Sequence, residues 1–180
     1  GRPGASTTPG NRRVGPSAST AGKELLIASV AIVGVKWLGA VALKFTPLKK
    51  LFKPNIQPVV TTSASPAAGH YSQAVKYGNT VYVSGLLPIT PEGVKLTGKP
   101  FAEQVAQTLS NLKEVLAAAG TNTNRLISCR IYIKDIHKWG EFNKLYGEFL
   151  GQHKPARAVV PVHDLHYGLE LEIEATASAR

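Results

Sequence analysis

The strongest constraint on the fold is a stretch near the C-terminus, residues 155–177, whose pattern predicts two β-strands joined by a short polar connection. Ala158 to Val162 is a continuous apolar run rich in β-branched residues, which predicts a buried strand. Leu169 to Ala175 alternates apolar residues with glutamates, which predicts a strand that shows one face to water. We expect the two strands to pair as a hairpin around His163 to Gly168.

Two charged residues of this stretch are candidates for chemistry. Arg157 stands at the start of the first strand and Glu172 lies within the second, so a hairpin would bring a guanidinium near a carboxylate. The guanidinium could bind a substrate carboxylate through two parallel hydrogen bonds, and the glutamate could accept a proton from water. The same pattern fits an ordinary cross-strand ion pair with Glu170 and Glu174 as solvated neighbours. The two residues alone leave both interpretations open.

Upstream, the pattern predicts a hairpin followed by a helix. Tyr71 to Lys76 and Thr80 to Ser84 read as two strands that turn at Gly78-Asn79. Phe101 to Ala119 carries apolar residues at helical spacing on one face, and Gly120 follows its last turn. This part of the chain therefore predicts a β-β-α unit.

A second helix is expected between two further strands. Leu126 to Ile133 predicts a buried strand, and its Cys129 is expected to act as a small buried hydrophobe. Asp135 can cap a helix that runs to Leu150. The aromatic and aliphatic residues of this helix that we expect to cover the sheet are Trp139, Phe142, Leu145, Tyr146 and Phe149. The predicted order is β-β-α-β-α-β-β, an α+β sheet with both helices on one face and an apolar face left for a partner.

Several motifs in this order resemble one known family. They are GHYSQAV, VYVSG, NLKEVLAAAG, EFNKLYGEFLGQHKPAR, PARAVV and LELEIEA, and they cover about Ser65 to Ala177. Together they resemble the Rid (reactive intermediate deaminase) family, also called YjgF. The resemblance implies a chorismate-mutase-like fold, a homotrimer with sites between subunits, and hydrolysis of 2-imino acids, or their enamine tautomers, to 2-oxo acids and ammonia. It implies no metal and no organic cofactor.

The resemblance also assigns roles to residues. Arg157 matches the arginine that binds the substrate carboxylate, and Glu172 matches the glutamate that positions the attacking water. Tyr71 and Asn143 match residues that line the pocket, and Gly85 matches a glycine whose backbone approaches the ligand. Arg157 and Glu172 are thus the expected catalytic residues.

Three positions depart from the family pattern. His70 replaces the usual proline before the tyrosine, Leu86 replaces a glutamine, and Val159 replaces a frequent cysteine. We expect His70 and Leu86 to affect substrate preference or turnover. His163, Asp164 and His166 share the last connecting loop, where we expect solvated side chains rather than metal ligands.

The first third of the chain predicts a membrane anchor. Residues 1–22 are rich in Gly, Ser, Thr and Arg, which predicts a disordered or partner-ordered tail similar to a trimmed transit peptide. Leu25 to Leu43 contains a single charged residue, Lys36, and is long enough to span a bilayer within a helix of residues 23–46. Residues 47–64 are expected to be a linker, and residues 65–180 the Rid-like domain.

Charge supports this division and argues against nucleic-acid binding. Up to Gln57 there are nine Lys or Arg and one acidic residue, whereas from Pro58 onwards there are twelve basic and ten acidic residues. A nucleic-acid-binding domain would carry its basic residues on the fold itself. We expect an organelle membrane protein, in the mitochondrial inner membrane rather than a chloroplast membrane, with the domain on the matrix or stromal side. The alternative to an enzyme is a non-catalytic accessory subunit of a respiratory or photosynthetic membrane complex.

Overall fold

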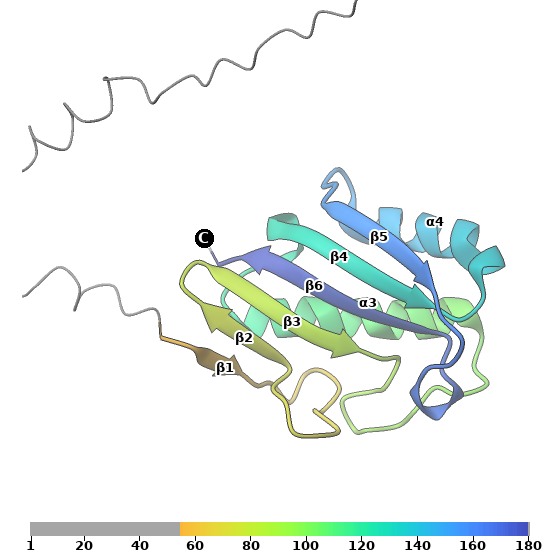
Figure 1. Ribbon diagram of the computed structural model, residues 1–180, viewed down its shortest axis with the longest axis horizontal. Coiled ribbons are helices and arrows are strands. Elements are labelled where there is room, and N and C mark those ends of the chain that lie inside the picture. Colours follow the sequence, from red (N-terminus) through yellow and green to blue (C-terminus); the bar gives the residue numbers. More distant parts are fainter. Residues whose placement is uncertain (1–54, 180) are drawn as a thin grey trace, which may run out of the picture. The chain divides into compact units, whose positions relative to one another are not determined.

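A sheet with two helices packed on one face makes up the part of the chain that the computed structural model describes, residues 55–179 (Figure 1). The strands of this part are β1 (Gln57–Val59), β2 (Ala74–Tyr77), β3 (Thr80–Leu86), β4 (Leu126–Ile133), β5 (Ala156–Pro161) and β6 (Leu171–Ser178). The helices are α3 (Phe101–Ala118) and α4 (Trp139–Leu150), with short 3₁₀ turns at η1 (Thr123–Arg125), η2 (Ile136–Lys138) and η3 (His166–Gly168). The predicted membrane helix, residues 23–46, lies outside the described residues. None of the helices within residues 55–179 has the length and apolar character needed to cross a membrane.

Local patterns predicted most of these elements correctly. β2 and β3 form the expected antiparallel hairpin, which turns at Gly78-Asn79. Helix α3 ends at the predicted point, and β4 has the predicted bounds with Cys129 buried. The Asp135 side chain accepts a hydrogen bond from the His137 backbone N–H, so it caps the 3₁₀ turn that leads into α4. The short strand β1 lies in the segment that the sequence predicted to be a linker.

The predicted hairpin between the last two strands is wrong. The sheet order is β1-β2-β3-β6-β4-β5, so β4 separates β5 from β6. β5 pairs in parallel with β4, whereas β6 is antiparallel to both β3 and β4. The reason is the connection: α4 spans the distance that a parallel crossover requires, which places β5 beside β4. β5 is therefore an edge strand with largely exposed residues rather than a buried one, and an edge tolerates its Pro161.

The hydrophobic core lies between the sheet and the helices. Leu171, Ile173 and Ala175 of β6 are buried in it, as the alternation predicted, and Ala177 is buried as well. The core side of α4 consists of Phe142, Tyr146 and Leu150, with Leu145 and Phe149 partly buried. Trp139 is 45% exposed, so the expectation that it covers the sheet is wrong. Its position in the first turn of α4 leaves it beyond the sheet-facing side chains.

The second face of the sheet is polar rather than apolar. Its central part holds Glu174, which accepts hydrogen bonds from Arg130 at 3.0 Å and from the Tyr132 hydroxyl at 2.8 Å. Thr176 of β6 pairs with Tyr82 of β3 on the same face. Because neighbouring strands place paired residues on one face, Glu172 shares this face with its partner Tyr132. Glu172, one of the two candidate catalytic residues, therefore lies on the sheet face away from the helices.

Candidate functional site

An irregularity in the pairing of β3 with β6 shapes the backbone against which the Glu172 side chain lies. Val83 pairs with Ala175 and Leu86 pairs with Ile173, so β3 has one residue more than β6 over this interval. Such a β-bulge bends its strand and re-aims the neighbouring side chains, and bulges are frequent beside active sites. The bulge contains Ser84 and Gly85 and faces the side chain of Glu172 across the strand pair.

Gly85 allows the Glu172 carboxylate to lie directly on the backbone of β3. A Cβ atom placed on Gly85 would be 1.8 Å from Glu172 Oε1 and 2.9 Å from its Cδ. No side chain can occupy position 85 while the carboxylate keeps this position. Gly85 was predicted to let its backbone approach a ligand closely. In the structure, the group that lies against it is the Glu172 carboxylate.

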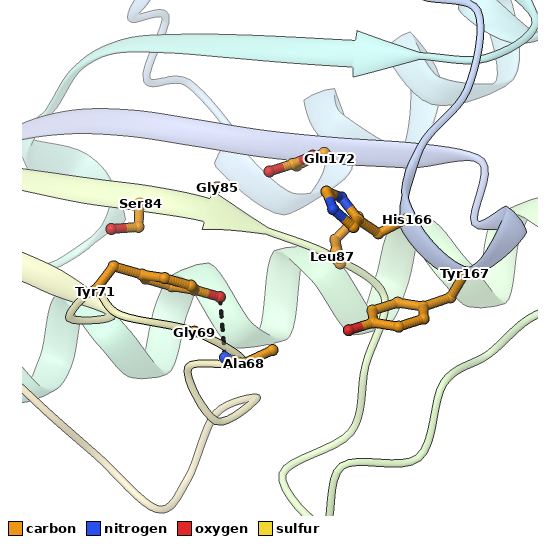
Figure 2. A pocket seen from close by; sticks show the side chains of 9 residues that line it. All are labelled: Ala68, Gly69, Tyr71, Ser84, Gly85, Leu87, His166, Tyr167 and Glu172. Atoms are coloured by element: carbon orange, nitrogen blue, oxygen red, sulfur yellow. Dashed lines mark hydrogen bonds between the residues drawn. The ribbon is translucent and has the colours of Figure 1, made fainter.

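A cavity of about 360 Å³ surrounds this carboxylate (Figure 2). Glu172 comes from β6, Gly85 from β3, Tyr71 from the loop before β2, and His166 and Tyr167 from η3. Figure 2 shows Glu172 and His166 on one side of the cavity and the rings of Tyr71 and Tyr167 on the other. The remaining lining residues are Ala68, Gly69, Ser84 and Leu87. The cavity thus combines one carboxylate with aromatic walls.

Buried amide side chains hold the loops that line the cavity. Asn111 of α3 donates hydrogen bonds to the carbonyl oxygens of Leu87 at 3.2 Å and Ile89 at 2.8 Å. Its Oδ1 accepts from the Ser65 N–H at 3.2 Å, so one side chain ties both loops to the helix. Gln73 supports the same loop and donates to the Ser65 carbonyl at 2.7 Å. Because buried polar groups are costly to leave unpaired, these bonds fix the loops in place.

The environment of Glu172 favours its neutral form. Partial burial raises the pKa of this carboxyl, since the charged form loses solvation, and the nearby Glu174 raises the pKa further. His166 acts in the opposite direction and lowers the pKa of Glu172. A glutamate whose pKa is raised is a better proton acceptor from water than an ordinary surface glutamate.

Arg157 and Asn143 form a second cluster. The Arg157 guanidinium donates a hydrogen bond to Asn143 Oδ1 at 3.0 Å and lies 5.1 Å from the centre of the Tyr146 ring. These residues line a cavity of about 440 Å³ together with His153 and Lys154. The second cluster is basic, so it complements the carboxylate of the first cavity.

The structure separates the two clusters within one chain. Arg157 pairs with Cys129 on the helix side of the sheet, whereas Glu172 pairs with Tyr132 on the opposite side. The predicted hairpin would have brought the two charges together, but the position of β4 between their strands prevents this. The expected group of five residues is thus divided: Tyr71, Gly85 and Glu172 lie together, and Arg157 lies with Asn143.

The residues that depart from the family pattern leave the first cavity open. Leu86 is buried in the core on the helix side, and its neighbour Leu87 lines the cavity instead. His70 is exposed and is not among the lining residues, and Val159 packs against the core from β5. Neither His70 nor Leu86 fills the space in front of Glu172.

Sequence reasoning missed six of the lining residues, including Ala68 and Gly69. Ser84 lies in the VSG motif and could have been inferred from the neighbouring glycine. Leu87 could not have been inferred as a lining residue without knowing the position of the bulge in β3. His166 was expected to be a solvated loop residue, and Tyr167 carried no signal at all, because the η3 turn that places both beside Glu172 has no distinctive pattern.

Comparison with known proteins agrees with this fold. The profile of the family described as endoribonuclease L-PSP matches residues 61–179. The chain is 39% identical over 123 residues to a 2-iminobutanoate/2-iminopropanoate deaminase of Rattus norvegicus, covering 68% of this chain and 90% of the relative. It is 35% identical over 135 residues to the mitochondrial protein MMF1 of Saccharomyces cerevisiae, covering 75% and 92% respectively.

Solved structures give the same assignment. The crystal structure of Escherichia coli TdcF with bound serine superimposes with a TM-score of 0.64 at 30% identity, covering 68% of this chain and 98% of TdcF. A sheet with two helices on one face is therefore a fold that this chain shares with TdcF. The chain belongs to the endoribonuclease L-PSP family, which is the Rid (YjgF) family that its motifs resemble.

Proposed function

We propose that this protein is an imine and enamine deaminase that hydrolyses 2-imino acids to 2-oxo acids and ammonia. The observation that carries the proposal is the Glu172 carboxylate, held over Gly85 at the wall of an open cavity. Its raised pKa suits the transfer of a proton from water. The identity of 39% to a 2-iminobutanoate/2-iminopropanoate deaminase supports the same reaction.

The two charged clusters match the two ends of such a substrate. A 2-imino acid carries a carboxylate beside a C=N group that is cationic when protonated. Arg157, presented with Asn143, can bind the carboxylate, and the Glu172 carboxylate can stabilise the protonated nitrogen. Because one chain holds these clusters on opposite sides of its sheet, we propose that the complete site forms between copies in a homotrimer.

The proposed reaction needs only these groups and water. Glu172 accepts a proton as the water oxygen bonds to the imine carbon, and the C=N electron pair moves to nitrogen, which gives a carbinolamine. Glu172 then gives the proton to nitrogen and the C–N bond breaks, which releases ammonia. Glu172 accepts the hydroxyl proton as that oxygen becomes the carbonyl of the 2-oxo acid, and then loses it to solvent. Orientation of the imine and delivery of one water are the main contributions to rate.

The experiment follows loss of an imine generated in place. The purified full-length chain is mixed with an amino-acid oxidase and 2-aminobutanoate, and semicarbazide traps the remaining imine. We expect the amount of trapped imine to fall when the wild-type protein is present. With Arg157→Ala it should equal the amount trapped without enzyme. Lys113→Ala, which removes an exposed charge from α3, serves as the control and should behave as wild type. Equal activity of wild type and Arg157→Ala would refute the proposal.

A mixing experiment tests the shared site. Separately, Arg157→Ala is expected to be inactive and Glu172→Gln to keep only a small residual activity. Unfolded together and refolded as mixed trimers, they should recover about a quarter of wild-type activity, because a quarter of the sites then combine an intact Arg157 with an intact Glu172. No recovery from a mixture that has formed trimers would mean that both residues act within one chain.

The membrane-tethered form of this enzyme remains a proposal. Leu25 to Leu43 could anchor the chain, and the similarity to mitochondrial MMF1 supports a mitochondrial location, for which we propose the inner membrane with the domain on the matrix side. Alkaline carbonate extraction of mitochondria tests this proposal. Recovery of the protein in the membrane pellet is the expected result, and full release to the supernatant contradicts it.

The separation of Arg157 from Glu172 also favours a second candidate function. A chain held as a single copy in a large membrane complex would present two incomplete half-sites and would serve as a non-catalytic accessory subunit. Native electrophoresis after mild detergent extraction distinguishes the two. A free trimer indicates the enzyme, and co-migration with a large complex indicates the subunit.

A further inference from the structure

Tyr167 adopts a backbone conformation that its side chain disfavours. Its φ and ψ are 63° and 15°, and among residues 55–179 it is the one non-glycine residue with a positive φ. A tyrosine pays a steric cost in this left-handed region, because Cβ approaches the following backbone. Such conformations persist where the surrounding structure imposes them, and they are concentrated at ligand sites.

Two contacts from one segment hold Tyr167 in place. The Thr97 hydroxyl donates a hydrogen bond of 2.8 Å to the Tyr167 carbonyl oxygen. The Lys95 ammonium lies 4.6 Å from the centre of the Tyr167 ring, within the range of a cation–π contact. The preceding residue, His166, has its ring 5.9 Å from the Tyr167 ring. Contacts on both the backbone and the ring therefore fix a large aromatic side chain at the cavity.

The Tyr167 ring forms part of the cavity wall opposite Glu172. Figure 2 shows Tyr167 and Tyr71 across the cavity from Glu172, with Leu87 between them. A substrate whose reacting carbon faces Glu172 would direct its side chain toward this apolar wall. Tyr167 is still 45% exposed in the single chain, so it has ring surface to offer. The deamination step described above does not use it.

The cavity in one chain has room for a large side chain. Its volume of about 360 Å³ is many times the space that one water needs. The imine derived from phenylalanine has twice as many non-hydrogen atoms as the imine derived from alanine and would fill more of this space. A small imine would leave the aromatic wall in contact with water.

We propose that Tyr167 is a specificity-determining residue, which makes the cavity selective for 2-imino acids with an aromatic or similarly large apolar side chain. This inference rests on the proposed deaminase function. The wall formed by Tyr71, Leu87 and Tyr167 buries the side chain, and Glu172 acts at the imine carbon regardless of side-chain size. Removal of the Tyr167 ring should therefore change the preference between substrates more than the reaction itself.

The test compares two imines and two variants. Tyr167→Gly removes the ring and suits the left-handed backbone, and Tyr167→Phe keeps the ring. We expect kcat/KM for the phenylalanine-derived imine to fall about tenfold in Tyr167→Gly relative to the alanine-derived imine, and to change little in Tyr167→Phe. Tyr77→Ala, which removes an exposed tyrosine at the remote end of β2, is the control. An unchanged ratio in Tyr167→Gly overturns the inference.

Binding separates this inference from the proposed function. If the wild type hydrolyses no imine, the deaminase assignment fails, and the affinities for phenylpyruvate and pyruvate then decide the selectivity. Tighter binding of phenylpyruvate that is lost in Tyr167→Gly supports the aromatic wall. If wild type and Tyr167→Gly show the same ratio of affinities for phenylpyruvate and pyruvate, the inference is overturned. Thermal unfolding of each variant verifies that the fold is retained.

Discussion

Gly85→Ala should disable the site while it leaves the fold intact. The new Cβ would lie 1.8 Å from Glu172 Oε1, whereas ordinary contact begins at 3.4 Å, so the carboxylate must move by about 1.6 Å. The glutamate moves rather than the strand, because its end rotates freely, whereas the Ser84 N–H is bonded to the Gln73 carbonyl at 3.1 Å. A proton acceptor misplaced by more than about 1 Å costs on the order of 100-fold in rate.

The stability of the Gly85→Ala variant should change little. The overlap involves mainly the end of a flexible side chain, and the displaced carboxylate gains solvent, so we expect a change in the free energy of unfolding within about 1 kcal/mol. Urea denaturation measures this change, and imine hydrolysis measures kcat/KM. Gly140→Ala in α4 is the matched control, because a Cβ there meets no atom within 4 Å.

A double-mutant cycle identifies the cause of the loss. In a Glu172→Ala background there is no carboxylate to displace, so Gly85→Ala should lower the remaining activity less than about twofold. The two single variants should therefore be far from additive. If Gly85→Ala reduces activity by the same factor in both backgrounds, the glycine acts on something other than Glu172 and the argument is refuted.

Three further outcomes follow from the structure. Asn111→Ala should lower the free energy of unfolding by about 2–4 kcal/mol in urea denaturation, because it leaves buried carbonyl and N–H groups of two loops unpaired. His166→Ala should move the acidic limb of the kcat/KM profile to higher pH: Glu172 must be ionised to accept a proton, and His166 lowers the pKa of Glu172. Cys129 is buried, which raises the pKa of its thiol, so it should react with iodoacetamide only after unfolding, as mass spectrometry can follow.

Local pattern was sufficient to locate elements but not to pair them. The alternation of Leu171, Ile173, Ala175 and Ala177 marks β6 because every second residue must face the core. The same pattern does not identify its neighbours, and the short connection after β5 suggested a hairpin. A right-handed crossover through α4 argues for parallel β4 and β5, and this rule would have corrected the order before the structure was known.

Some residues of the candidate site were predictable, but their arrangement was not. Family motifs identified Glu172 and Gly85, and the structure brings them into contact. Arg157 was identified from the same motifs, yet it lies with Asn143 on the other side of the sheet. The hairpin prediction placed Arg157 and Glu172 together in one chain, although the family resemblance implied sites between subunits, which do not require this.

The features that local rules predict least well are concentrated around one cavity. A bulge interrupts β3 at Ser84 and Gly85, the partly buried Glu172 has a raised pKa, and Tyr167 takes a left-handed conformation. Each is unfavourable for an isolated chain, since it forgoes a regular strand pair, the solvation of a charge or a relaxed backbone. In a chain whose remaining elements follow local preference, such departures are expected where function opposes stability. Their convergence on the space in front of Glu172 is an argument for a working site that does not depend on any relative.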